Sequence, residues 1–348
     1  MKYILEKIGR DIKDSMTSVF RKEKYRKPKG VLTKSGRGRL HVDKNRIIDE
    51  EGNDIILKGI RIDDPLCMAF KERDYNERDF DTLKEWGANI IGITIYPGLF
   101  EKNADYLEKY VDPIVEMCEE RGMYLLLGWH SHGNAIKGES EKAEWENSPP
   151  FGGNPFNPKK EFVKDSLKAI ATRYKSKKNL IYGTFNEPTF ITWGEWRPVA
   201  EELIDAVHEG DPDAIVTVAG VDWGYDLRGA IDDPVKRGNV IYETHPYNWK
   251  GDKWKDFIPK LSQKSPVILG EWGLGPKNPN DRKWWYEIDR YEESLDYGNQ
   301  LMDMCDEYGI GWTAWIWHYK NTPRMLKNFD TYETTSYGDF VKKQLKRE

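Results

Sequence analysis

Short apolar runs rich in β-branched residues recur along most of the chain. After a first strand that ends near residues 59–60, they cover residues 89–95, 123–129, 180–185, 214–219, 240–244, 267–270 and 311–317, which makes eight. The segments between them show helical spacing, as over residues 104–121, and two of these helical segments end at Gly87 and Gly122. Apolar strands alternating with helices indicate a parallel sheet covered on its outer face. Eight such units predict a single (β/α)8 TIM barrel.

The first 39 residues do not follow this alternation. Apolar residues recur at helical spacing at Ile4, Ile8, Ile12, Met16 and Val19. A basic stretch follows over residues 21–39, so we expect an N-terminal helix and linker at 1–39, outside a catalytic barrel domain at 40–348. The helix is expected to dock on the barrel or to be mobile, and a weak association with membrane surfaces is the alternative.

The sequence also predicts a hairpin before the first strand and two long connections after later strands. Residues 40–57 predict a hairpin with its turn at Gly52-Asn53, leading into the first strand. Residues 131–160 and 273–291 form long connections that leave the C-terminal ends of strands, so both should wall the same face of the barrel.

Composition narrows the class of protein further. With 38% hydrophobic residues the chain can form a large core, and a net charge of −5 gives no indication of nucleic-acid binding. No window is apolar enough for a membrane span, and the first eight residues lack the apolar segment of a signal peptide. The location of the protein in the cell stays open, because the expected function indicates an extracellular protein and the sequence a cytoplasmic one. Three widely spaced cysteines (Cys67, Cys118 and Cys305) are expected to be buried thiols, and a monomer is expected.

Two glutamates end apolar runs immediately before a turn signal. Glu187 follows the run at 180–185 within Asn186-Glu187-Pro188, and Glu271 follows the run at 267–270. The interval between them is close to three strand–helix units, which places them roughly opposite one another at the barrel mouth. Two facing carboxylates are what glycoside hydrolysis requires. The sequence therefore predicts a glycosidase.

A mechanism can be assembled around this pair. Glu271 is the expected nucleophile, oriented by a hydrogen bond from Tyr247. Glu187 is the expected acid and base, with a pKa raised by the charge of Glu271 and by partial burial. An unpaired Glu271 beside Glu187 should also have a raised pKa.

Other polar and aromatic residues follow the same strand ends and should contact the sugar. Asn186 could bond the 2-hydroxyl, and His130 and His245 could hold hydroxyls or the carboxylates. Trp315 could form the floor on which a pyranose stacks. At least two of eight further tryptophans are expected to line a cleft: Trp145, Trp193, Trp196, Trp223, Trp249, Trp254, Trp284 and Trp285.

Over residues 40–330 the sequence resembles glycoside hydrolase family 5, the cellulase family of retaining clan A barrel enzymes. Four motifs in order carry the resemblance: Trp129-His130, Asn186-Glu187-Pro188, His245-Pro-Tyr247 and Gly270-Glu271-Trp-Gly273, with Thr313-Ala-Trp315 after them. The resemblance implies that Glu187 is the acid/base and Glu271 the nucleophile. It also implies a β-linked polysaccharide or oligosaccharide substrate, with β-1,4-glucan expected and endo action favoured.

The chain departs from the family pattern at two positions. Gly92 stands where the family usually carries an arginine on the second strand, and Gly128 stands where an aspartate commonly precedes Trp-His. Arg61, at the end of the first strand, is the candidate replacement cation and is placed in the substrate-binding face. These departures leave open a carbohydrate-binding barrel with weakened catalysis.

Neither a cofactor nor a metal ion is expected. His130, His132 and His245 could form a metal-dependent hydrolase site, but no acidic partner at suitable spacing is evident. Within the leading function, mannan, xyloglucan and β-1,3-glucan remain alternative substrates.

Overall fold

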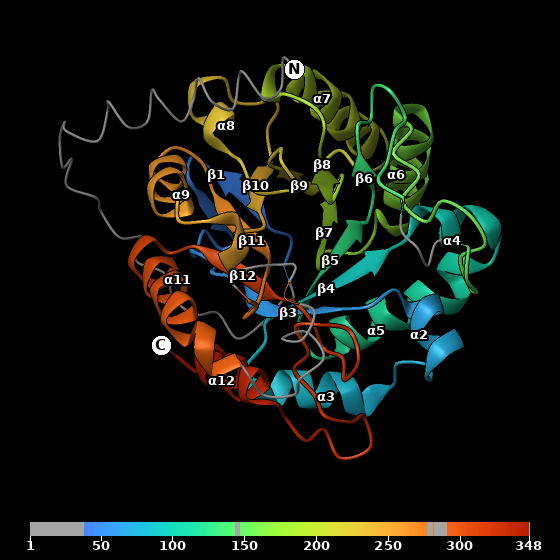
Figure 1. Ribbon diagram of the computed structural model, residues 1–348. Helices are drawn as coiled ribbons and strands as arrows, with labels where there is room; N and C mark the ends of the chain where they lie inside the picture. Colours follow the sequence, from blue (N-terminus) through green and yellow to red (C-terminus); the bar gives the residue numbers. More distant parts are fainter. Residues whose placement is uncertain (1–37, 143–146, 277–280, 282–290, 348) are drawn as a thin grey trace.

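Eight parallel strands close into a barrel at the centre of the molecule. The computed structural model describes residues 38–142, 147–276, 281 and 291–347. Figure 1 shows the strands at the centre, with helices around them. In barrel order the strands are β3 (Lys58–Ile62), β4 (Ile90–Ile95), β5 (Tyr124–Trp129), β7 (Leu180–Gly183), β9 (Ile215–Ala219), β10 (Val240–Thr244), β11 (Val267–Trp272) and β12 (Gly311–Ala314), and β12 pairs with β3. The predicted barrel and its eight strands are confirmed.

Helices separate most of the barrel strands in sequence. They are α2 (Pro65–Lys71), α3 (Glu77–Trp86), α4 (Pro97–Lys102), η1 (Leu107–Val111), α5 (Asp112–Glu120), α6 (Lys160–Tyr174), α7 (Trp193–Gly210), α8 (Arg228–Asp232), η2 (Asn248–Lys250), α9 (Trp254–Ser262), η3 (Tyr291–Ser294), α11 (Leu295–Tyr308) and α12 (Ser336–Leu345). Helix α3 begins at a capping box of Asn76 and Asp79 and ends at Gly87, whose φ of 107° is left-handed. The helix predicted over 104–121 is a π-helical turn, η1, that runs directly into α5.

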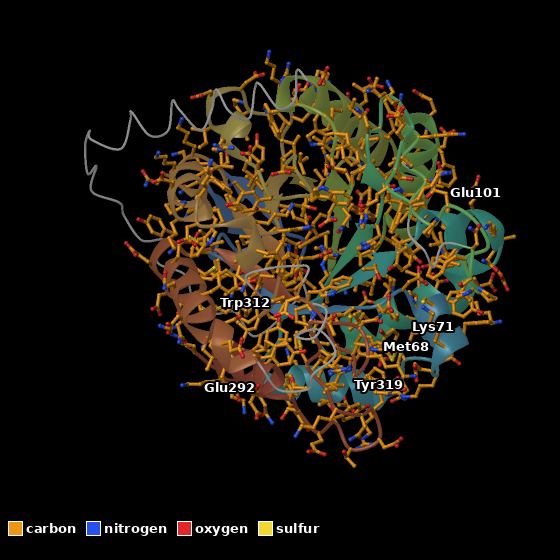
Figure 2. All side chains as sticks on the ribbon, in the orientation of Figure 1. Met68, Lys71, Glu101, Glu292, Trp312 and Tyr319 are labelled. Atoms are coloured by element: carbon orange, nitrogen blue, oxygen red, sulfur yellow. The ribbon has the colours of Figure 1, made fainter. Side chains whose placement is uncertain are left out.

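The apolar side chains form two clusters. The larger one fills the space between the barrel and its helices, and every residue of β4 and β5 is buried. The smaller one lies inside the barrel, where side chains two residues apart on a strand face the same way. Figure 2 shows Trp312 well inside the molecule and Glu101 and Glu292 at its edge. Burial on both faces explains why the strands read as continuous apolar runs.

A short hairpin covers the N-terminal end of the barrel. Strands β1 (His41–Asp43) and β2 (Arg46–Ile48) pair antiparallel, and Ile47 packs on the inner cluster. Its turn was not predicted: Lys44 makes it, in the left-handed conformation with a φ of 59°. The predicted turn at Gly52-Asn53 is confirmed as a second turn, across which Ile48 forms an antiparallel bridge with Asp54.

Several predictions fall partly or wholly outside the described residues. They include the N-terminal helix and linker, Trp145, Trp284, Trp285 and most of the connection at 273–291. The three cysteines are buried free thiols, as predicted. Among the helices of the described ranges, none combines the length and the apolar character that crossing a membrane requires.

Candidate functional site

The two glutamates converge at the C-terminal end of the barrel. Glu187 follows β7 and belongs to the two-residue strand β8 (Glu187–Pro188), which pairs with β6 (His132–Gly133). Glu271 lies in β11, where the pairing with β12 shifts register between Leu269 and Trp272. Such an irregularity re-aims a side chain. One oxygen of each carboxylate and a ring nitrogen of His245 all lie within 4.8 Å of one another.

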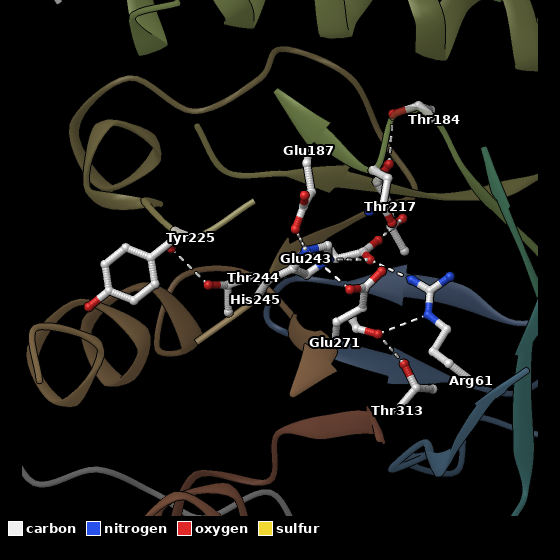
Figure 3. A network of polar contacts seen from close by, with 12 residues as sticks. Arg61, Thr184, Glu187, Thr217, Tyr225, Glu243, Thr244, His245, Glu271 and Thr313 are labelled. Carbon is white, nitrogen blue, oxygen red and sulfur yellow. Dashed lines mark hydrogen bonds and ion pairs between the residues drawn. The ribbon is translucent and has the colours of Figure 1, made fainter. Parts of the chain in front are cut away.

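His245 connects the two carboxylates to the barrel interior. Its Nδ1 lies 3.0 Å from Glu187 Oε1 and 4.0 Å from Glu271 Oε2, and its Nε2 lies 3.2 Å from Glu243 Oε1 (Figure 3). Burial disfavours the charged ring, but the three carboxylates outweigh it and raise the pKa of His245 to about 10. The ring is therefore an imidazolium at neutral pH, and both of its nitrogens donate hydrogen bonds.

Tyr247 contacts the second glutamate as predicted. Its hydroxyl donates to Glu271 Oε2 at 3.2 Å, and its ring stacks on Trp249 with centroids 4.4 Å apart. Burial raises the pKa of Tyr247 well above its usual value, so the hydroxyl keeps its proton as a donor.

The carboxylates differ in their surroundings. Burial raises the pKa of Glu271, and the charge of Glu187 adds to this rise, whereas His245 and Arg61 oppose it. Burial also opposes ionisation of Glu187, but His132 and His245 outweigh it and lower its pKa. The raised pKa predicted for Glu271 is thus confirmed. The raised pKa predicted for Glu187 is wrong, because His245 Nδ1 lies closer to Glu187 than to Glu271.

His130, Asn186 and Trp315 border the pair. The ring of His130 stacks on Trp315 with centroids 5.9 Å apart and planes at 11°. Burial lowers the pKa of His130 well below its usual value, which leaves the ring neutral. Asn186 is 4% exposed, and its Oδ1 has no hydrogen-bond partner within the described part of the chain. An unpaired buried acceptor of this kind suits a ligand hydroxyl.

Two polar residues of the site were not among the predicted site residues. His132 Nε2 lies 3.6 Å from Glu187 Oε2, and Glu243 pairs with His245 and Arg61. Glu243 stands two residues before His245 on β10, so strand alternation places both on one face. That spacing could have identified Glu243. His132 was considered only as a metal ligand.

Arg61 lies in the barrel interior with no exposed surface. Its Nη2 donates to Glu243 Oε1 at 2.7 Å, and its Nε donates to the carbonyl of Gly270 at 2.9 Å. It makes no hydrogen bond to Glu271, and its effect on that carboxylate is a longer-range attraction that lowers the pKa. A position in the substrate-binding face is therefore wrong for Arg61, since the side chain is buried among the strands.

The tryptophans divide into core and mouth residues. Trp193, Trp196 and Trp254 are at most 2% exposed and pack in the core, because they occupy the first turns of α7 and α9. Trp223 and Trp249 are half-buried and contact site residues: Trp223 meets His132 edge-on at 6.0 Å. Of the eight further tryptophans, these two are the ones within the described residues that could meet a ligand.

The group Glu187, His245 and Glu271 is compact enough to be considered as a metal site. Both ring nitrogens of His245 face carboxylates, Nδ1 toward Glu187 and Nε2 toward Glu243, which favours a doubly protonated ring over a metal ligand. The arrangement is that of an organic cation between anions.

Comparison with known proteins identifies relatives of this chain. The family model described as cellulase (glycosyl hydrolase family 5) matches residues 48–321. Endoglucanase E-5 of Thermobifida fusca is 24% identical over 295 residues, covering 80% of this chain and 55% of that protein. Endoglucanase A of Butyrivibrio fibrisolvens is 25% identical over 318 residues, covering 87% of this chain and 65% of that protein. The chain thus spans between half and two thirds of the length of these relatives.

Solved structures share the fold. A beta-glucanase from Saccharophagus degradans, solved in complex with cellotetraose, superposes with a TM-score of 0.77 at 24% identity, covering 94% of this chain and 97% of that one. The catalytic domain of Thermobifida fusca endoglucanase Cel5A gives a TM-score of 0.70 at 21% identity, covering 89% and 99%. The predicted membership of glycoside hydrolase family 5 is confirmed. With a family model matched over most of its length, the chain belongs to glycosyl hydrolase family 5, the cellulase family.

Proposed function

We propose that this protein is a retaining, endo-acting glycoside hydrolase that cleaves a β-linked polysaccharide, with β-1,4-glucan as its substrate. One observation carries the proposal: oxygens of Glu187 and Glu271 lie within 4.8 Å of each other at the barrel mouth. Carboxyl groups of retaining glycosidases lie about 5–5.5 Å apart, whereas inverting enzymes need about 6.5–9.5 Å to admit a water molecule.

The reaction proceeds as a double displacement. Glu271 attacks the anomeric carbon while the glycosidic bond breaks, and Glu187 gives its proton to the leaving oxygen. Glu187 then takes a proton from water, which attacks the glycosyl–Glu271 ester and releases the sugar. Tyr247 holds Glu271 in position through its hydroxyl, and the free Oδ1 of Asn186 accepts a hydrogen bond from the sugar.

Charges in the site support one shared proton on the glutamate pair. Arg61 and His245 contribute two positive charges, and Glu243, with a pKa of about 2, contributes one negative charge. One further negative charge on Glu187 and Glu271 together makes the cluster neutral. Hydrolysis starts from the form with the proton on Glu187, so the proton must reside there when substrate is bound.

Aromatic side chains around the carboxylates suit a sugar polymer. Trp315, Trp223 and Trp249 are half-buried beside the site, and Phe190, three residues after Glu187, is 50% exposed. Flat rings of this kind stack on pyranose faces. The names of relatives, which include endoglucanases, favour a glucan and endo action.

The test combines product analysis with variants of the pair. Glu271→Ala should abolish hydrolysis, whereas Glu187→Ala should impair substrates with poor leaving groups far more than activated aryl glycosides, which need little protonation. Glu116→Ala, on the exposed face of α5, is the matched control and should leave rates unchanged. Proton NMR of the first product should show the β anomer, and an inverted product would refute the proposal.

Hydrolysis of a panel of glycans identifies the substrate. Cleavage of β-1,4-glucan into a range of oligosaccharides supports the proposal, and a preference for mannan, xyloglucan or β-1,3-glucan replaces the substrate without changing the mechanism. Binding without turnover would favour the carbohydrate-binding barrel that Gly92 and Gly128 suggest. Activity that a strong chelator removes would favour a metal-dependent site instead.

A further inference from the structure

A layer of the barrel interior next to His245 is polar and half glycine. On most strands the layer residue stands two positions after a residue of the inner apolar cluster, so both face the barrel interior. The layer takes one residue from each barrel strand: Arg61, Gly92, Gly128, Gly183, Thr217, Glu243, Gly270 and Thr313. Arg61 and Glu243 are its charged members and form an ion pair at 2.7 Å. A buried ion pair in a barrel core carries a large desolvation cost, so its presence calls for a reason.

Glycines make the room for Arg61. A Cβ atom added at Gly92 would lie 2.5 Å from Arg61 Cδ, and one added at Gly128 would lie 2.3 Å from Arg61 Nη1. Neither glycine has a left-handed φ, so their backbone conformations do not require glycine. The absence of side chains at Gly92 and Gly128 is therefore explained by the path of the arginine across β4 and β5.

The partner carboxylate is enclosed in the same way. A Cβ atom at Gly270 would lie 1.8 Å from Glu243 Oε1. That oxygen accepts from Arg61 Nη2 at 2.7 Å and from His245 Nε2 at 3.2 Å, and Oε2 accepts from the hydroxyl of Thr217. Burial opposes the ionised form, but His245 and Arg61 outweigh it and hold the pKa of Glu243 at about 2.

We propose that Glu243 and Arg61 are positioning residues that act on the Glu187–Glu271 pair through His245. Glu243 fixes the ring through Nε2, which directs the Nδ1 proton at the two carboxylates, and Arg61 keeps Glu243 ionised inside the barrel. This inference rests on the proposed function for its catalytic consequence. Its structural part, the fixed and doubly protonated ring, does not depend on the substrate.

The charged and titratable groups around His245 come from several elements. They are Glu187 on β8, Glu271 on β11, Glu243 on β10, His132 on β6, His130 after β5, Arg61 on β3 and, near Glu187, Lys250 in η2. Among these groups, Glu243 is the carboxylate facing Nε2, so replacing it tests the positioning of the ring without altering either of the proposed catalytic groups.

The first experiment replaces Glu243 by glutamine, which keeps the shape and removes the charge. In wild-type protein, ¹⁵N NMR of His245 should show both ring nitrogens protonated at pH 7. In Glu243→Gln the titration midpoint of the ring should move to lower pH, and hydrolysis should slow by about ten- to a thousandfold. The pH–rate profile should change as well. An unchanged midpoint with a rate within about twofold of wild type would overturn the proposal.

The second experiment displaces Arg61 without removing its charge. Gly92→Ala introduces the methyl group that overlaps Arg61 Cδ, whereas Gly238→Ala has no atom within 4 Å of the added methyl and is the matched control. We expect Gly92→Ala, but not Gly238→Ala, to shift the His245 midpoint and slow hydrolysis. Equal behaviour of the two variants would contradict the proposal.

The two proposals fail in different ways. If wild-type protein hydrolyses no glycan, the proposed function fails, while the His245 titrations still report on the pair. If hydrolysis occurs but Glu243→Gln changes stability alone, with an unaltered pH–rate profile and ring titration, then Glu243 and Arg61 are merely structural. The double variant Arg61→Met/Glu243→Gln removes both buried charges and gives a second reading if a single variant unfolds.

Discussion

Replacing Arg61 by methionine should leave the buried Glu243 carboxylate with His245 as its remaining cationic partner. Arg61 has no exposed surface, and its Nη2 lies 2.7 Å from Glu243 Oε1. Burial disfavours the charge on Glu243, yet His245, Arg61 and Thr217 lower its pKa from 4.5 to about 2. This difference corresponds to about 3 kcal/mol, which His245, Arg61 and Thr217 supply together. Breaking a buried ion pair from one side costs about 3–5 kcal/mol, so we expect the free energy of unfolding to fall by about 3 kcal/mol.

Urea unfolding at pH 7, followed by tryptophan fluorescence and circular dichroism, measures this loss. Arg237→Met is the matched control, because Arg237 pairs with Asp205 at the surface, and such pairs contribute about 0–1 kcal/mol. Arg61→Met/Glu243→Gln should recover most of the loss. Since the folded pKa of Glu243 is depressed, its stabilising effect is present above about pH 4.5 and lost toward pH 2. The gap between wild type and Arg61→Met should therefore narrow in acid. Equal unfolding energies for Arg61→Met and Arg237→Met would refute the reasoning.

Three further predictions concern other parts of the molecule. The pKa of His245 is raised from 6.5 to about 10, so its contribution to stability is complete below pH 6.5 and is lost as pH rises through 10. In a calorimetric pH series, the Tm of wild type should decline over that interval, whereas the Tm of His245→Asn should not. Phe190→Ala should raise KM for long oligosaccharides several-fold with little change for an aryl glycoside. Phe70, on α2, is at least as exposed, and Phe70→Ala should change neither. Deleting residues 1–38 should leave turnover nearly unchanged, and loss of folding in the truncated chain would show that this segment belongs to the core.

The barrel was predictable because its determinants are local. Strands buried on both faces are apolar along most of their length, and the helices between them carry their own capping signals, such as Asn76 and Gly87 around α3. The turn at Lys44 was missed for a reason of the same kind. Lys44 adopts a left-handed conformation that sequence preference assigns to glycine, so the turn at Gly52 was predicted and the one at Lys44 was not.

The site was predictable where residues follow strand ends and less so inside the strands. Glu187, Glu271 and Tyr247 follow or end apolar runs, and the structure brings them together. Glu243 lies within such a run, and the only sequence feature that identifies it as a site residue is its position two residues before His245. The path of Arg61 could not be foreseen, because a long side chain can reach several strands and its course depends on which neighbours lack a Cβ atom.

The central claim is a double displacement at Glu271 assisted by Glu187. An activated 2-deoxy-2-fluoro-β-glucoside or cellobioside slows both steps but slows release more, so it should trap the covalent intermediate. Mass spectrometry of the treated protein should show the addition of one sugar, and peptide mapping should place it on Glu271. No label under conditions where the protein hydrolyses glycans, or a label on Glu187, would contradict the account.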